Sequence, residues 1–190
     1  MKKFVTACIG ESTYKCKRLT KSDVQKISNR LLTIQSYCPY EFARKPRCIE
    51  EYIHYKATEF RHLLLYTGPV VFRDILEDDP YKHFLLIHSA SRALSKSHPC
   101  DGDLEFAEMS LKVYVECCQH IYGDTFLTYN IHGLLHVVSD VRTLGNLDNY
   151  SAFPYENNLM FFRNNDHQSQ IKPLHRHYKG PMTENYKNIS

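Results

Sequence analysis

The chain has 190 residues, of which 43% are hydrophobic and 13% aromatic. A chain of this length and composition can bury a sizeable hydrophobic core, which argues against wholesale disorder and for a single domain or part of one. Its formal net charge of +3 permits binding to nucleic acid but does not argue for it.

The seven cysteines follow no pattern of cross-linking or metal binding. Their number is odd, two of them are adjacent, and no Cys-x-x-Cys occurs, so the sequence predicts reduced thiols rather than a disulfide framework or a zinc ribbon. No segment approaches the roughly 18 consecutive apolar residues that a membrane span needs. We therefore expect an intracellular protein, nuclear or cytoplasmic, that is neither secreted nor membrane-bound.

The hydrophobic pattern becomes helical after the first 19 residues. Residues 1–19 show no clear period, and we expect an irregular segment there. Ser22 suits the N-cap of a first helix that ends before Pro39. The apolar residues of this helix recur at spacings of three and four: Val24, Ile27, Leu31 and Ile34.

Further helices are predicted along the remainder of a helical region over residues 20–163. They cover residues 49–66, 70–76, 80–98, 101–121, 129–144 and 154–163. The helix over 101–121 carries four residues on one face: Phe106, Met109, Val113 and Cys117. No alternating strand pattern is longer than a few residues, so the expected fold class is mainly α. The polar composition of residues 164–190 predicts a disordered tail.

Two histidines, His132 and His136, are four residues apart in the helix predicted for 129–144. At this spacing both imidazoles project from one helical face and can reach one zinc ion. The same spacing opens the zinc-protease motif, but Gly133 stands where that chemistry needs a glutamate. Alternatively, both are ordinary core or surface histidines, because such a pair arises readily by chance in a chain with 11 histidines.

Glu156 lies at the expected start of the last helix. Pro154 suits the first helical position, so Glu156 takes the third, where unpaired backbone N–H groups and the helix dipole keep a carboxylate ionised. An ionised, oriented carboxylate suits a Mg²⁺ ligand in two-metal phosphoryl transfer. Alternatively, Glu156 only stabilises its own helix.

Three separated segments carry a resemblance to a known family. They are Lys56-Ala-Thr-Glu-Phe-Arg61, Leu65-Tyr-Thr-Gly-Pro-Val-Val71, and the stretch from His132 to Glu156, which ends in Ser-Ala-Phe-Pro-Tyr-Glu. In this order they resemble the C-terminal part of CACTA-type (EnSpm-like) DDE transposases. The resemblance implies an RNase H-like core and an ancestral role in DNA cleavage and strand transfer, with Mg²⁺ held by three carboxylates.

The resemblance also assigns roles to the candidate site residues. Glu156 matches the last of the three catalytic carboxylates, while the family's first two lie upstream of the region that this chain covers. His132 and His136 match half of a structural zinc site whose other half, a Cys-x-x-Cys, does not occur here. The chain would thus correspond to the helical insertion region and final helix of the core, with the sheet largely absent.

We therefore predict a truncated or degenerate transposase-derived protein that is not catalytic alone. The alternative is a helical module that has been retained to bind protein or DNA. Apolar faces that once packed on a sheet would be exposed in such a fragment, which predicts self-association.

Basic residues indicate where DNA could bind. Arg44, Lys45 and Arg47 form a basic loop that could contact phosphates, although a solvated loop is the alternative. Relatives of the transposase type continue the last helix with a basic face, of which only Arg163 remains in this chain.

Overall fold

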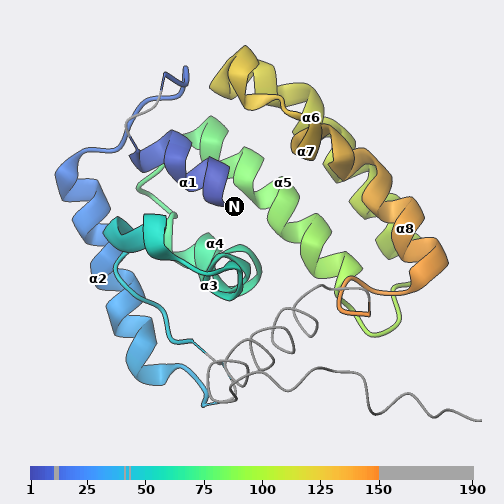
Figure 1. Cartoon of the computed structure of the whole chain (residues 1–190), viewed down its shortest axis with the longest axis horizontal. Coiled ribbons are helices and arrows are strands. Elements are labelled where there is room, and N and C mark those ends of the chain that lie inside the picture. Colours follow the sequence, from blue (N-terminus) through green and yellow to red (C-terminus); the bar gives the residue numbers. More distant parts are fainter. Residues whose placement is uncertain (11–12, 41, 43, 150–190) are drawn as a thin grey trace, which may run out of the picture. The chain divides into compact units, whose positions relative to one another are not determined.

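The computed structural model describes residues 1–10, 13–40, 42 and 44–149. Every regular element within these ranges is helical and none is a strand, so the expectation of a mainly α fold is confirmed (Figure 1). Among the described residues, no helix combines the length and the apolar character needed to cross a bilayer. Glu156, Arg163 and the predicted tail over 164–190 lie outside the described residues.

The helices follow one another with short connections (Figure 1). The α-helices are α1 (Lys2–Ile9), α2 (Lys21–Tyr37), α3 (Ala57–His62), α4 (Gly68–Val71), α5 (Asp78–Leu94), α6 (Asp101–Tyr122), α7 (Tyr129–His132) and α8 (Val137–Leu144). Three 3-10 turns cover Ile49–His54, Asp124–Phe126 and Gly133–His136, and a π-helical turn covers Leu63–Thr67.

The first segment differs from the sequence-based expectation. Residues 1–19 were predicted to be irregular, yet they contain α1, which packs its apolar side into the core. Five of its eight residues are buried, including Phe4 and Cys8. The helix is amphipathic, with Lys2, Lys3 and Thr6 on one side and the buried residues on the other, but at eight residues it is too short for the period to be recognised in the sequence. The prediction of an irregular start is therefore wrong for Lys2–Ile9.

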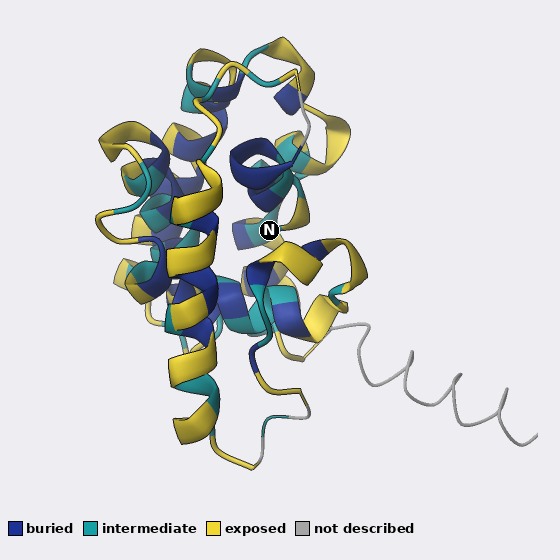
Figure 2. Cartoon of the chain, turned by 90° about the vertical axis from the view of Figure 1, so that its left-hand side faces the viewer, coloured by how far each residue is buried: buried dark blue, intermediate teal, exposed yellow. Residues whose placement is uncertain are grey.

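Helix α2 begins one residue before the predicted N-cap. Thr20 is the N-cap, because its Oγ1 accepts a hydrogen bond from the Asp23 backbone N–H at 3.2 Å. The apolar stripe lies as the spacing predicted, with Ile27 and Leu31 buried against the core. The outer face of the helix remains exposed (Figure 2).

The helix predicted for residues 49–66 is broken into a 3-10 turn, α3 and a π-helical turn. The break falls at Lys56, where the backbone N–H donates to Glu59 Oε2 at 2.8 Å and starts α3. Gly68 then opens α4 against α5, and a Cβ on this residue would lie 2.4 Å from Phe84 Cζ. Only a glycine therefore allows the two helices to approach this closely.

Helices α5 and α6 form an antiparallel pair, with α5 in the middle of the fold and α6 on its outer side (Figure 1). Helix α5 starts at Asp78 with Glu77 as its N-cap, two residues before the predicted start. Helix α6 ends at Gly123, whose φ of 88° stops the helix while its N–H donates to Gln119 O. Helix α8 packs beside α6, and Arg142 on α8 pairs with Glu108 at 3.3 Å.

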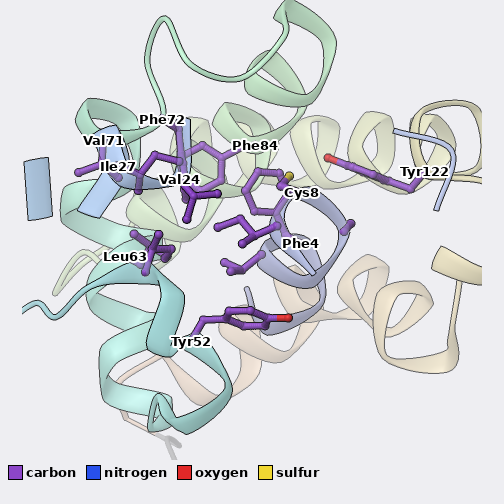
Figure 3. Close-up of a cluster of buried hydrophobic side chains, with 14 of the residues drawn as sticks. Phe4, Cys8, Val24, Ile27, Tyr52, Leu63, Val71, Phe72, Phe84 and Tyr122 are labelled. Atoms are coloured by element: carbon purple, nitrogen blue, oxygen red, sulfur yellow. The ribbon is translucent and has the colours of Figure 1, made fainter. Parts of the chain in front are cut away.

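The core consists of two hydrophobic clusters. The first is rich in aromatic rings and joins α1 to α5 and α6: the ring of Phe4 lies 5.3 Å from that of Phe84 and 5.6 Å from that of Phe72 (Figure 3). The second is formed by small and aliphatic residues of α5, α6 and α8, including Ala90, Ala107, Leu111 and Val138. The described residues thus bury a core of their own without any strand.

Candidate functional site

The two predicted zinc ligands, His132 and His136, lie close together on the surface. The helix expected over 129–144 is interrupted: α7 ends at His132, and a 3-10 turn leads to α8. The rings remain on one side, with centroids 5.8 Å apart and planes at 72°. Both residues are exposed to solvent.

No third ligand joins this pair among the described residues. Within residues 1–10, 13–40, 42 and 44–149, no group of three or more His, Cys, Asp or Glu side chains is arranged to hold a metal ion. Structural zinc sites use four protein ligands, so the histidine pair supplies half of one. Zinc binding by the pair stays a prediction, as does the catalytic role of Glu156.

The three cations of the basic loop differ in their surroundings. The guanidinium of Arg47 donates to Glu59 and Glu51, at 2.7 Å in each case, and its third partner is the His54 carbonyl. Arg44 and Lys45 are exposed beside it. Of the three predicted phosphate contacts, Arg47 is therefore engaged in holding the fold.

The Arg47 partner Glu59 stays charged although it is buried. Burial disfavours the carboxylate, but hydrogen bonds from Arg47 and from the Lys56 backbone N–H outweigh that effect and lower the pKa of Glu59. Glu59 lies within residues 56–61, so this segment is fixed to the basic loop by an ion pair.

A groove between α5 and α6 was not predicted from the sequence. Its volume is about 420 Å³, within the range of ligand or peptide sites. Leu86, Cys117 and Ile121 provide apolar lining, and polar side chains stand around them. The complete lining is Asp79, Lys82, His83, Leu86, Cys117, His120 and Ile121.

His83 forms the buried wall of this groove. Its Nε2 lies 2.7 Å from the Tyr114 carbonyl and its Nδ1 lies 3.1 Å from Tyr122 Oη. Burial lowers the pKa of His83, so the ring is neutral near pH 7. A neutral ring that donates from Nε2 to the carbonyl accepts from the Tyr122 hydroxyl at Nδ1. His83 therefore has both nitrogens engaged and fixes α5 to α6.

Nucleophilic chemistry is not supported by the cysteine beside His83. Cys118 Sγ lies 3.9 Å from His83 Nε2, which superficially places a thiol beside an imidazole. Burial raises the pKa of Cys118 to about 12, so it is protonated near pH 7. Because the thiolate is the reactive form, Cys118 acts as a packing residue.

The outward face of α6 continues the apolar lining of the groove. We define the α6 stripe as Phe106, Met109, Val113 and Cys117. The first three are 49%, 67% and 39% exposed, and Cys117 leads into the groove. The sequence predicted that these residues share one face, but the structure shows that this face lies outward. A contiguous exposed apolar face of this kind is characteristic of interaction surfaces.

The sequence indicated that His83 lies on the buried side of its helix, but it did not indicate which face of α6 points outward. His83, Ile87, Ala90 and Leu94 recur at spacings of four, three and four, so a polar residue occupies a buried stripe. A polar residue in such a position needs partners, and here it marks the wall of the groove.

Comparisons with protein-family models, with curated proteins and with solved structures found no match.

Proposed function

We propose that this chain is a transposase-derived helical interaction module that has no catalytic activity of its own. The observation that carries the interaction role is the α6 stripe, which is exposed beside the α5–α6 groove. The core is complete without it, so folding of the described residues does not depend on covering the stripe.

The transposase origin rests on the order of three segments in the sequence. Residues 56–61, 65–71 and 132–156 follow one another as in CACTA-type DDE transposases. In this proposal, the chain represents the helical insertion region and final helix of an RNase H-like core, and its ancestral role was DNA cleavage and strand transfer.

The absence of catalysis follows from the number of available carboxylates. By resemblance, Glu156 is the last of three metal-binding residues, and one carboxylate cannot hold two hard cations. Purified protein should therefore leave supercoiled plasmid DNA uncut in Mg²⁺ or Mn²⁺. Nicking that Glu156→Gln abolishes would show that the chain is an active nuclease.

Site-specific photo-crosslinking tests the interaction role. A photoreactive residue in place of Met109 should give cross-linked protein adducts in cells that express the chain, because Met109 is the most exposed member of the stripe. The same residue in place of Lys21, which is exposed on α2, is the matched control. Equal adducts at both positions, or none at Met109, would contradict protein binding through the stripe.

DNA binding is the second candidate function, because Arg44 and Lys45 remain exposed and without a hydrogen bond or ion pair among the described residues. If both cations contact phosphates, the affinity for duplex DNA should fall roughly tenfold between 50 and 200 mM salt. Replacing both by glutamine should remove that dependence. Fluorescence anisotropy with a labelled duplex measures both effects, and binding that ignores salt would exclude this role.

A further inference from the structure

The flank of the α6 stripe carries two opposite charges one helical turn apart. Lys112 and Glu116 are both exposed, and neither forms an ion pair across the described part of the fold. Both lie on the side of the stripe that faces away from the α5–α6 groove, as their helical positions require. The outward surface of α6 thus combines an apolar centre with a charged edge.

The arrangement of these residues is self-complementary. When two copies of α6 meet antiparallel about a two-fold axis beside Val113, the two Val113 side chains contact each other. Met109 of each copy then meets Cys117 of the other, and Phe106 meets His120. From Phe106 to His120 the contact extends over about 21 Å at 1.5 Å per residue.

The charged residues beside the stripe also favour this antiparallel arrangement. In an antiparallel pair related by a two-fold axis, the same flank of each helix faces its counterpart. Lys112 of one copy therefore lies beside Glu116 of the other, and the symmetry repeats this ion pair. A parallel two-fold pair would instead bring opposite flanks of the two helices together, so it would not pair Lys112 with Glu116.

Helix α5 adds an apolar residue at the same level. The His83 ring stacks on Tyr114 with centroids 4.0 Å apart, which fixes the relative height of the two helices. Leu86 lies one turn further along α5 and is half-buried in the groove wall. It is therefore near the level of Val113, where the two-fold axis brings it towards Leu86 of the second copy.

We propose that the α6 stripe binds a second copy of this chain, with α6 packed antiparallel on α6 about a two-fold axis at Val113. This inference rests on the proposed interaction function and names the occupant of the same surface. Self-complementary charge is the feature that favours a second copy over an unrelated helix.

Sedimentation velocity and disulfide trapping test this register. The full chain should sediment as a dimer whose population rises with concentration. In a variant with Cys100 and Cys117 changed to serine, Val113→Cys should form an intermolecular disulfide under mild oxidation, because a residue on the axis meets its own copy. Glu105→Cys, which is exposed on the same helix but about two turns from the axis, should not.

Charge-reversal variants distinguish a specific interface from nonspecific hydrophobic association. Lys112→Glu should weaken the dimer roughly fivefold by turning two ion pairs into two repulsive pairs. Glu116→Lys should weaken it similarly, and the double exchange should restore the affinity of the original chain. Val113→Glu should abolish the dimer, while circular dichroism confirms that the helices persist.

The outcomes distinguish this inference from the proposed function. A monomer at every concentration, equal trapping at positions 113 and 105, or no rescue by the double exchange would overturn the second copy as occupant. If Met109 then still cross-linked to a different protein, the interaction function would stand with another partner. If Met109 cross-linked to nothing, both the second copy as occupant and the interaction function would be refuted.

Discussion

On the inward face of α6, Ala107, Leu111 and Tyr114 are buried against α5 and α8, whereas on the outward face Phe106 and Met109 are exposed. Both faces are apolar, and they belong to one continuous helix. The comparison shows that hydrophobic residues at helical spacing need not belong to the core. The inward face supports folding, and the outward face is available for binding.

The adjacent cysteines give the sharpest test of this comparison, because Cys118 points inward and Cys117 lies on the outward side. With its pKa raised to about 12 by burial, Cys118 should react with iodoacetamide at pH 8 roughly a thousandfold more slowly than an ordinary thiol. Timed labelling and mass spectrometry measure this in the Val113→Glu variant, which keeps the stripe uncovered. Equal labelling of the two thiols in the folded chain would refute the distinction, and denaturant should remove it.

A matched pair of truncations compares the stability of the two faces. Leu111→Ala should lower the free energy of unfolding by about 2–5 kcal/mol, because it leaves a cavity between α5, α6 and α8. Val113→Ala should change it by no more than about 0.5 kcal/mol at concentrations where the chain is monomeric. Urea denaturation measures both. Similar losses at the two positions would show that the stripe is part of the core.

His83 should make the inward face sensitive to pH. Burial lowers its pKa below the ordinary value of 6.5, so the unfolded chain binds more protons as the pH falls. The stability that His83 contributes is complete above about pH 6.5 and is lost as the pH falls towards the folded-state pKa. The melting temperature should therefore decrease between pH 7.5 and 5.5.

Replacement of His83 identifies the source of that slope. His83→Gln should flatten the dependence of melting temperature on pH. His62, whose pKa burial also lowers, accounts for part of the slope that remains. A slope that persists in full in the His83 variant would contradict the assignment.

Met109→Gln should have the smallest effect on folding and a distinct effect on association. The exposed side chain contributes little burial, so the free energy of unfolding should change by less than about 0.5 kcal/mol. The dimer should weaken, because an amide replaces an apolar side chain at its centre. Thermal melts and sedimentation on one sample separate the two effects, and a large loss of stability would place Met109 in the core.

The candidate site was only partly accessible to sequence reasoning. The pattern placed His132 and His136 on one side, and the structure keeps their rings together despite the break in the helix. It could not reveal that Arg47 is engaged by Glu59, because that partner becomes a neighbour only when α3 folds against the loop. The groove could not be predicted, because the residues that line it belong to two helices and lie about 35 residues apart in the sequence.

By itself, the sequence determined the mainly α fold class and the positions of α2, α5 and α6, because helical spacing and turn residues act locally. Only the tertiary structure decided that α1 is a helix, since a helix of eight residues is too short to be stable alone and depends on the burial of its apolar side. It also decided which apolar face of α6 points inward. Both faces satisfy the same periodicity, and the choice between them depends on where α5 and α8 pack.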